Sequence, residues 1–165
     1  MGILGRDDTG NSTGNNSTRI VRMSRFTLAE DGMTGAVKIY SAITNAATKY
    51  RCAIYQANAT PVPTTQMGVT NEATGITAAT WMTLSFPTAV VLPAADYFLM
   101  VQVETNPGAG CWGIQLATGT NRYYAAATYP YFPNPWSGTL GTDLYDEMCI
   151  YSEYSIGVPA SNFYM

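Results

Sequence analysis

The sequence predicts an all-β fold, an antiparallel β-sandwich with about eight strands. Apolar residues alternate with other residues in well-separated stretches, most clearly over 36–44, 48–57 and 96–105. Turn-forming residues such as Gly32 and Pro61 lie between these stretches, and no stretch has convincing helical periodicity. A length of 165 residues suits a single domain with a real core.

The elements follow in order along the chain. Residues 1–18 are expected to form an extended polar arm, because the tract from Thr9 to Thr18 has no apolar periodicity. Such an arm is mobile unless a neighbouring subunit or its own domain holds it. Residues 19–158 are expected to form the sandwich, and residues 159–165 a C-terminal tail. Strands are expected near residues 19–28, 36–44, 48–57, 80–86, 96–105, 111–118, 121–128 and 144–156. The Thr-, Asn- and Gly-rich stretch 58–79 is expected to be a long connection between the two sheets.

The amino-acid composition argues against several classes of binding partner. Charged residues make up 12% of the chain, about half of the usual ~25%, and the net charge is −3. Nucleic acid is not an expected partner, because its binding depends on clustered Lys and Arg. A membrane is not expected either, since no stretch approaches the roughly 18 apolar residues of a spanning helix and the first residues lack the pattern of a secretion signal. A weakly charged surface favours packing against copies of the chain or against neutral ligands.

The sequence offers little for catalysis. The chain has no histidine, which excludes Ser-His-Asp and Cys-His sites. Asp143, Asp146 and Glu147 are the densest acidic group, but Asp146 and Glu147 point to opposite faces of a predicted strand. Three widely spaced cysteines without Cys-x-x-Cys spacing do not predict a metal site. We expect buried thiols, with an intermolecular disulfide through Cys111 as the alternative. The sequence therefore predicts a protein without catalytic residues, metal or cofactor.

The strongest local signal is aromatic. Residues 122–136 contain six aromatic residues and three prolines. Proline limits the entropy that a loop loses on binding, and Tyr and Trp can stack on a sugar or fill a partner's pocket. The candidate ligand- or partner-binding residues are Trp112, Tyr123, Tyr124, Tyr129, Tyr131 and Trp136. The alternative is that Tyr123, Tyr124 and Phe132 close one end of the sandwich.

Several core and turn segments carry a resemblance. These include Gly35-Ala-Val-Lys-Ile-Tyr40, Tyr50-Arg-Cys-Ala-Ile-Tyr55, Trp81-Met-Thr-Leu84 and Ala95-Asp-Tyr-Phe-Leu99. Over residues 26–104 the chain resembles a jelly-roll domain of phage virion proteins and bacterial surface proteins, which is similar in fold to carbohydrate-binding modules. The resemblance implies the fold more than a function, and it assigns no binding residue.

Two functional hypotheses remain. The first is a non-enzymatic structural protein of a virion or extracellular assembly, such as a capsid decoration, fibre or tail component, that forms a homo-oligomer, contacts other particle subunits and lays its arm across a neighbour. The second is a carbohydrate-binding module that attaches to a surface glycan through Trp112, Tyr129, Tyr131 and Trp136.

Overall fold

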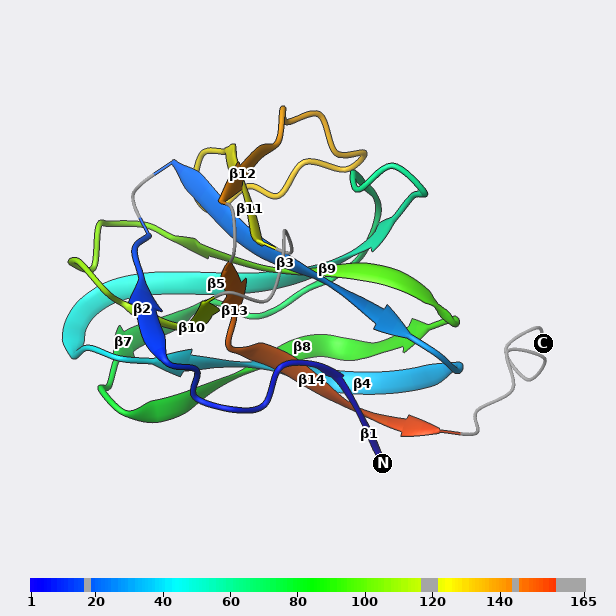
Figure 1. Ribbon diagram of the computed structural model, residues 1–165, viewed down its shortest axis with the longest axis horizontal. Helices are drawn as coiled ribbons and strands as arrows, with labels where there is room; N and C mark the ends of the chain where they lie inside the picture. The colour runs from blue at the N-terminus through cyan, green and yellow to red at the C-terminus, as the bar shows by residue number, and fades with distance from the viewer. Residues whose placement is uncertain (17–18, 117–121, 144–145, 157–165) are drawn as a thin grey trace.

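A computed structural model describes residues 1–16, 19–116, 122–143 and 146–156. These residues form fourteen strands and no helix, arranged in two antiparallel seven-stranded sheets that pack face to face (Figure 1). None of them belongs to a helix that could span a membrane. The predicted all-β sandwich is confirmed, although the described residues form more strands than the eight expected.

The first sheet, sheet A, is the lower layer in Figure 1. Its long strand β4 (Gly32–Ser41) lies between β8 (Thr80–Leu92) and β14 (Ile150–Ile156), and β1 (Gly2–Gly5) pairs with β14. At the other end of the sheet, β10 (Trp112–Leu116) pairs with β13 (Asp146–Met148), with β2 (Ser12–Gly14) and with the end of β4.

The second sheet, sheet B, is the upper layer. Its central strand β9 (Ala95–Val103) lies between β3 (Ile20–Leu28) and β5 (Asn45–Ala57). Beyond β3 follow β11 (Arg122–Ala126) and β12 (Gly141–Asp143), and beyond β5 lie β6 (Pro63–Val69) and β7 (Ala73–Ile76). The chain crosses between the sheets repeatedly, because β3, β5, β9 and β11 belong to sheet B and β4, β8, β10 and β14 to sheet A.

The hydrophobic residues form two clusters on the two faces of sheet B. Along β9, Tyr97, Leu99 and Val101 join the large cluster between the sheets, whereas Phe98 and Met100 join a second cluster on the outer face. This is the period of two that a strand imposes. Because both faces of β9 are apolar and buried, something must cover the outer face of sheet B as well.

Each of the eight predicted strands overlaps a strand of the structure. The prediction of one long connection over 58–79 is wrong, since β6 and β7 lie there and pair with β5. Most of their residues are partly exposed or exposed, so they lack the apolar alternation by which strands are recognised. Between them, the Thr70 hydroxyl accepts from the Cys52 amide and the Thr70 amide donates to the Cys52 carbonyl.

The N-terminal arm lies on its own domain over residues 1–16. Leu4 of β1 is fully buried between the sheets, and the Arg6 amide donates to the Ile150 carbonyl. The Arg6 guanidinium also pairs with Glu147, with an Nε–Oε1 distance of 2.9 Å. The described part of the arm therefore contacts its own domain, which is one of the two tethers that the sequence left open. The predicted tail, residues 159–165, lies outside the described residues.

Candidate functional site

Two of the six predicted aromatic residues belong to the core. Trp112, at the start of β10, is 1% exposed and packs near Tyr50 between the sheets. Tyr123 of β11 is buried on the outer face of sheet B, where its ring contacts Phe98 edge to face at a centroid distance of 5.4 Å. Neither ring can stack on a ligand, so the structure removes both from the predicted platform.

Tyr124 points away from that cluster. It alternates with Tyr123 along β11, so the two rings lie on opposite faces of the strand. The Arg22 guanidinium lies over the Tyr124 ring, 5.1 Å from its centroid. Tyr124 is partly exposed, but it does not join the other aromatic residues.

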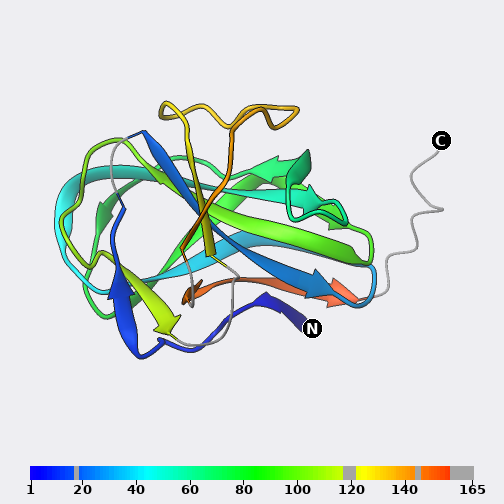
Figure 2. The ribbon, with the colours of Figure 1, turned by 45° about the horizontal axis from the view of Figure 1, so that its top comes forward.

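The aromatic segment forms a lid over sheet B. We call residues 127–140 the lid loop; it connects β11 and β12 and passes over the top of the molecule in Figure 2. Phe132 is 5% exposed and packs into the outer cluster with Phe98 and Met100. The Trp136 ring meets Tyr55 edge to face at 5.5 Å, and its Nε1 donates to the Gly138 carbonyl. The loop thus covers the sheet by inserting its own side chains.

Polar contacts fix the lid loop in place. The buried Tyr55 hydroxyl donates to the Pro133 carbonyl at 2.7 Å, and the Gln66 amide donates to the Phe132 carbonyl and to the Tyr55 hydroxyl. These bonds satisfy the backbone of a loop that forms no strand over these residues. The sequence analysis gave as an alternative that Tyr123, Tyr124 and Phe132 close one end of the sandwich. Phe132 and Tyr123 are indeed packed side chains, but they cover the outer face of sheet B rather than an end of the sandwich.

Tyr131 and Tyr129 remain at the surface of the lid loop. Tyr131 is 63% exposed. The Tyr129 hydroxyl donates to Glu72 at 2.6 Å, beside a hollow of about 470 Å³ that Arg19, Glu104 and Pro130 also line. Burial, followed by the Glu72 carboxylate, raises the pKa of Tyr129, and the hydrogen bond from Tyr129 lowers the pKa of Glu72. Of the predicted residues, these two and Trp136 lie on the lid loop, where Tyr129 contacts Glu72 and Trp136 packs against Tyr55.

The acidic and cysteine residues weighed for catalysis and metal binding have structural roles where the structure describes them. Glu147 is buried and ion-paired with Arg6, while the side chains of Asp143 and Asp146 lie outside the described part of the chain. All three cysteines are free and buried. Burial raises the pKa of Cys111 to about 11, and its thiol donates weakly to the Gly14 carbonyl. A buried, protonated thiol does not form an intermolecular disulfide, so that alternative for Cys111 is not supported. The described residues hold no group of three His, Cys, Asp or Glu side chains placed to bind a metal ion.

A second aromatic surface, missed by the sequence analysis, lies on the outer face of sheet A. Tyr40 of β4 pairs in register with Trp81 of β8, and the rings meet edge to face at 5.4 Å. Tyr151 of β14 contacts the same indole at 4.8 Å. We call Tyr40, Trp81 and Tyr151 the aromatic cluster; all three are partly exposed.

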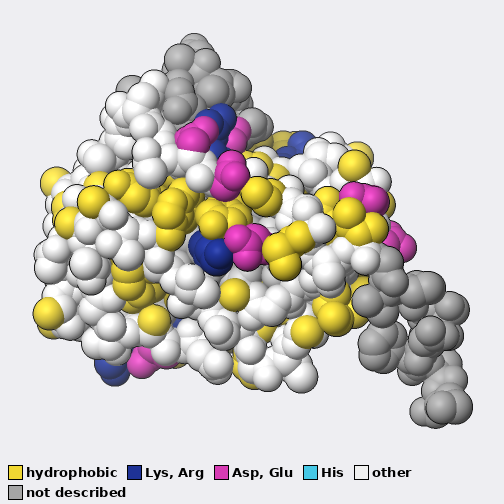
Figure 3. All heavy atoms as spheres, turned by 90° about the horizontal axis from the view of Figure 1, so that it is seen from below, with side chains coloured by type: hydrophobic (Ala, Val, Ile, Leu, Met, Phe, Trp, Pro, Cys, Tyr) yellow, Lys and Arg dark blue, Asp and Glu magenta, His cyan; other side chains and the backbone are white. Residues whose placement is uncertain are grey.

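An ion pair lies beside the aromatic cluster. Lys38 Nζ is 2.8 Å from Glu153 Oε1 and 5.3 Å from the centre of the Tyr151 ring. The hydrogen bond to Glu153 raises the pKa of Lys38, so its ammonium stays charged at neutral pH. Figure 3 shows this side of the molecule, where hydrophobic side chains form a band with a basic and an acidic side chain side by side near its middle.

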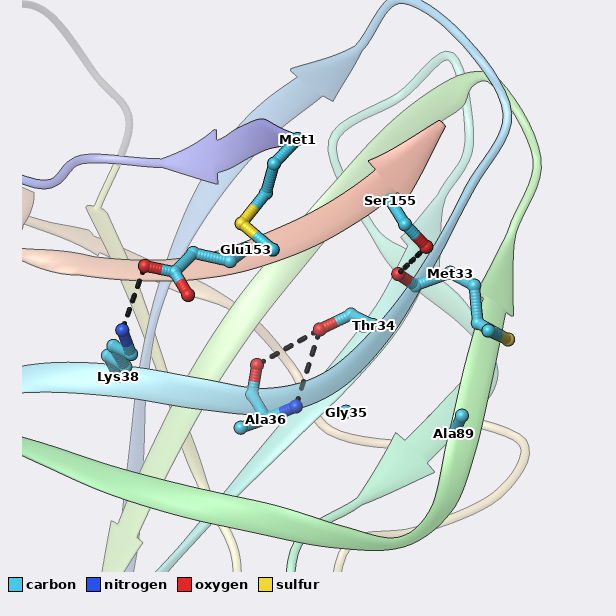
Figure 4. A pocket seen from close by; sticks show the side chains of 9 residues that line it. All are labelled: Met1, Met33, Thr34, Gly35, Ala36, Lys38, Ala89, Glu153 and Ser155. Carbon is cyan, nitrogen blue, oxygen red and sulfur yellow. Dashed lines mark hydrogen bonds and ion pairs between the residues drawn. The ribbon is translucent and has the colours of Figure 1, made fainter. Parts of the chain in front are cut away.

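Two hollows lie at the ends of this surface. One, of about 420 Å³, lies beside the ion pair and has small residues in its lining (Figure 4). Its lining consists of Met1, Met33, Thr34, Gly35, Ala36, Lys38, Ala89, Glu153 and Ser155. The other, of about 330 Å³, lies next to Tyr40 and is lined mainly by residues 9–13 of the arm.

The alternation of Val37 and Ile39 with Lys38 and Tyr40 could have indicated that the latter two point outward. Their proximity to Trp81 and Tyr151 depends on strand pairing and register, which alternation does not give.

No protein-family model matches the chain, and no curated protein is significantly similar to it in sequence.

Proposed function

We propose that this chain is a non-enzymatic structural protein that self-assembles, a jelly-roll subunit of a virion or extracellular assembly that packs on its neighbours through the outer face of sheet A. The observation that carries the proposal is the aromatic cluster. Sheet B covers its outer aromatic residues with the lid loop, whereas Tyr40, Trp81 and Tyr151 stay partly exposed on the outer face of sheet A. The repeated crossing of the chain between the sheets supports the jelly-roll assignment.

The composition of this face suits a protein contact. Trp and Tyr are enriched at the centres of interfaces, where a few such residues carry most of the binding free energy. The rest of β8 presents uncharged residues, since the strand reads TWMTLSFPTAVVL. The outer face of a sheet can pack face to face against another sheet at about 10 Å.

The test is the solution mass of the protein, measured by light scattering after size exclusion over a range of concentrations. We expect a defined oligomer whose dissociation constant rises about 30-fold or more in Trp81→Ala. Tyr131→Ala is the matched control, because it removes a more exposed aromatic ring from the other side of the molecule. A wild-type monomer at every concentration, or an oligomer that Trp81→Ala leaves unchanged, would refute the proposal; circular dichroism confirms that each variant folds.

The second candidate function is attachment to a carbohydrate. It is favoured by the exposed Tyr131 ring, which lies on the lid loop two residues from Tyr129 and the hollow that Tyr129 lines. On this hypothesis, binding to a glycan array is lost in Tyr131→Ala and retained in Trp81→Ala. Retention of glycan binding in Tyr131→Ala would exclude the lid loop as the sugar site.

A further inference from the structure

On β4, β8 and β14, the strands that carry the aromatic cluster, the charges are confined to one pair. Lys38 is the only charged residue of β4, Glu153 is the only one of β14, and β8 has none. Their side chains are 26% and 40% exposed, so water still reaches the pair. A partner that covers the neighbouring aromatic cluster takes this water away.

Removing water from an ion pair is unfavourable unless new polar partners replace it. A purely apolar partner surface would leave Lys38 and Glu153 with each other alone. A partner with one charge would complement one of them and repel the other. The surface that suits the pair carries an anion opposite Lys38 and a cation opposite Glu153.

A second copy of this chain presents that surface. Lys38 lies on β4 and Glu153 on the adjacent β14. In a face-to-face contact, a two-fold axis parallel to the strands and midway between them places β14 of one copy over β4 of the other. Glu153 of each copy then faces Lys38 of the other, and the four charges alternate in sign.

The shape of the face is self-complementary about the same axis. Ile3 of β1 pairs in register with Glu153, and its side chain is 48% exposed on the far side of Glu153 from Lys38. The hollow of about 420 Å³, which Met1 and Glu153 also line, reaches across β4 to β8, where Gly35, Ala36 and Ala89 line it (Figure 4). The two-fold operation that opposes the charges also brings Ile3 of one copy over this hollow of the other.

We propose that two copies of the chain form an isologous dimer through the outer face of sheet A, in which Lys38 and Glu153 of each copy pair with Glu153 and Lys38 of the other. This inference rests on the proposed function and names the neighbour and the symmetry of its contact. The axis places the two aromatic clusters together at one end of the four charges, where they keep water from that side of the pair.

Charge reversal tests the dimer. Lys38→Glu brings four carboxylates together and Glu153→Lys brings four ammonium groups together, so each variant alone is expected to be a monomer, with a dissociation constant at least about 100-fold higher. A mixture of the two variants forms a dimer again, because one copy then carries two anions and the other two cations. The double variant Lys38→Glu/Glu153→Lys also dimerises. Light scattering measures each mass.

Lys49→Glu is the matched control. It makes the same change of charge at another exposed ion pair, with Glu72 and Glu104, and is expected to leave the mass unchanged. The two-fold contact is overturned if the single variants stay dimeric, or if their mixture stays monomeric. When the wild-type oligomer depends on Trp81 but shows no rescue on mixing, the two-fold contact fails and the proposed assembly through this face stands. A wild-type monomer overturns both.

Discussion

The lid loop makes a strong prediction, because adjacent residues in it have opposite environments. Phe132 is 5% exposed beneath the loop, and Tyr131 is 63% exposed above it. We expect Phe132→Ala to lower the free energy of unfolding substantially and Tyr131→Ala to change it by less than about 0.5 kcal/mol. The two variants change adjacent residues: one removes a ring that is buried beneath the loop, and the other removes a ring that is exposed above it.

The magnitude follows from the buried area. A buried phenylalanine removes roughly 150 Å² of apolar surface from water, which at about 25 cal/mol per Å² amounts to about 4 kcal/mol. The unfolded chain already buries part of that surface, so the difference between the folded and unfolded states is nearer 3 kcal/mol. This agrees with the lower end of the roughly 3–5 kcal/mol measured when buried Phe is truncated to Ala. A surface loop can settle into part of the space, which also favours the lower end.

Urea unfolding at equilibrium, followed by circular dichroism, measures both variants. The slope with urea should stay constant, so that a shift of the midpoint reports stability alone. A loss below about 1 kcal/mol in Phe132→Ala would refute the inference that the lid loop is part of the hydrophobic core. A large loss in Tyr131→Ala would refute the orientation of the loop.

Three further predictions concern the arm, the thiols and acid stability. Gly5 has φ = 118° and a Cβ there would collide with the Ile150 carbonyl, so Gly5→Ala should speed amide hydrogen exchange of residues 2–5 while β9 stays protected. The three thiols should react with Ellman's reagent only once denaturant unfolds the protein, and reaction of Cys111 in the native state would contradict its burial. The Thr27 hydroxyl and Arg25 hold the pKa of Asp96 in the folded protein below its ordinary 3.8. The contribution of ionised Asp96 to the free energy of unfolding is therefore complete above pH 3.8 and is lost as the pH falls through the lower pKa of the folded state. Urea unfolding at about pH 5 and about pH 2.5 should therefore show a smaller acid loss in Asp96→Asn than in the wild type.

The sequence could predict the fold class because the period of two is a local property. The eight predicted stretches each contain enough alternating apolar residues to be recognised alone. Strands β1, β2, β6, β7 and β12 could not be found this way, because they are short or polar and form only where a longer strand offers a free edge.

The candidate site was predictable only in part. The aromatic segment was visible in the sequence, but which of its rings faces inward depends on the position of Tyr55, Phe98 and Met100 beneath it. The aromatic cluster of sheet A was not visible at all, because its members come from residues 40, 81 and 151. Alternation says that each points outward, and only the register of three strands shows that they meet.

The two outer faces of the sandwich differ in a way that bears on their roles. The cluster beneath the lid loop consists of apolar residues, as suits a surface that is covered as the chain folds. The aromatic cluster of sheet A instead has Lys38 and Glu153 beside it. A charged pair keeps an apolar face compatible with water before it is covered, and disfavours any partner that does not match both signs. A permanently buried face needs neither property. The ion pair is therefore consistent with the proposed contact, in which this face is exposed in the separate subunit and is covered by a partner of matching charge.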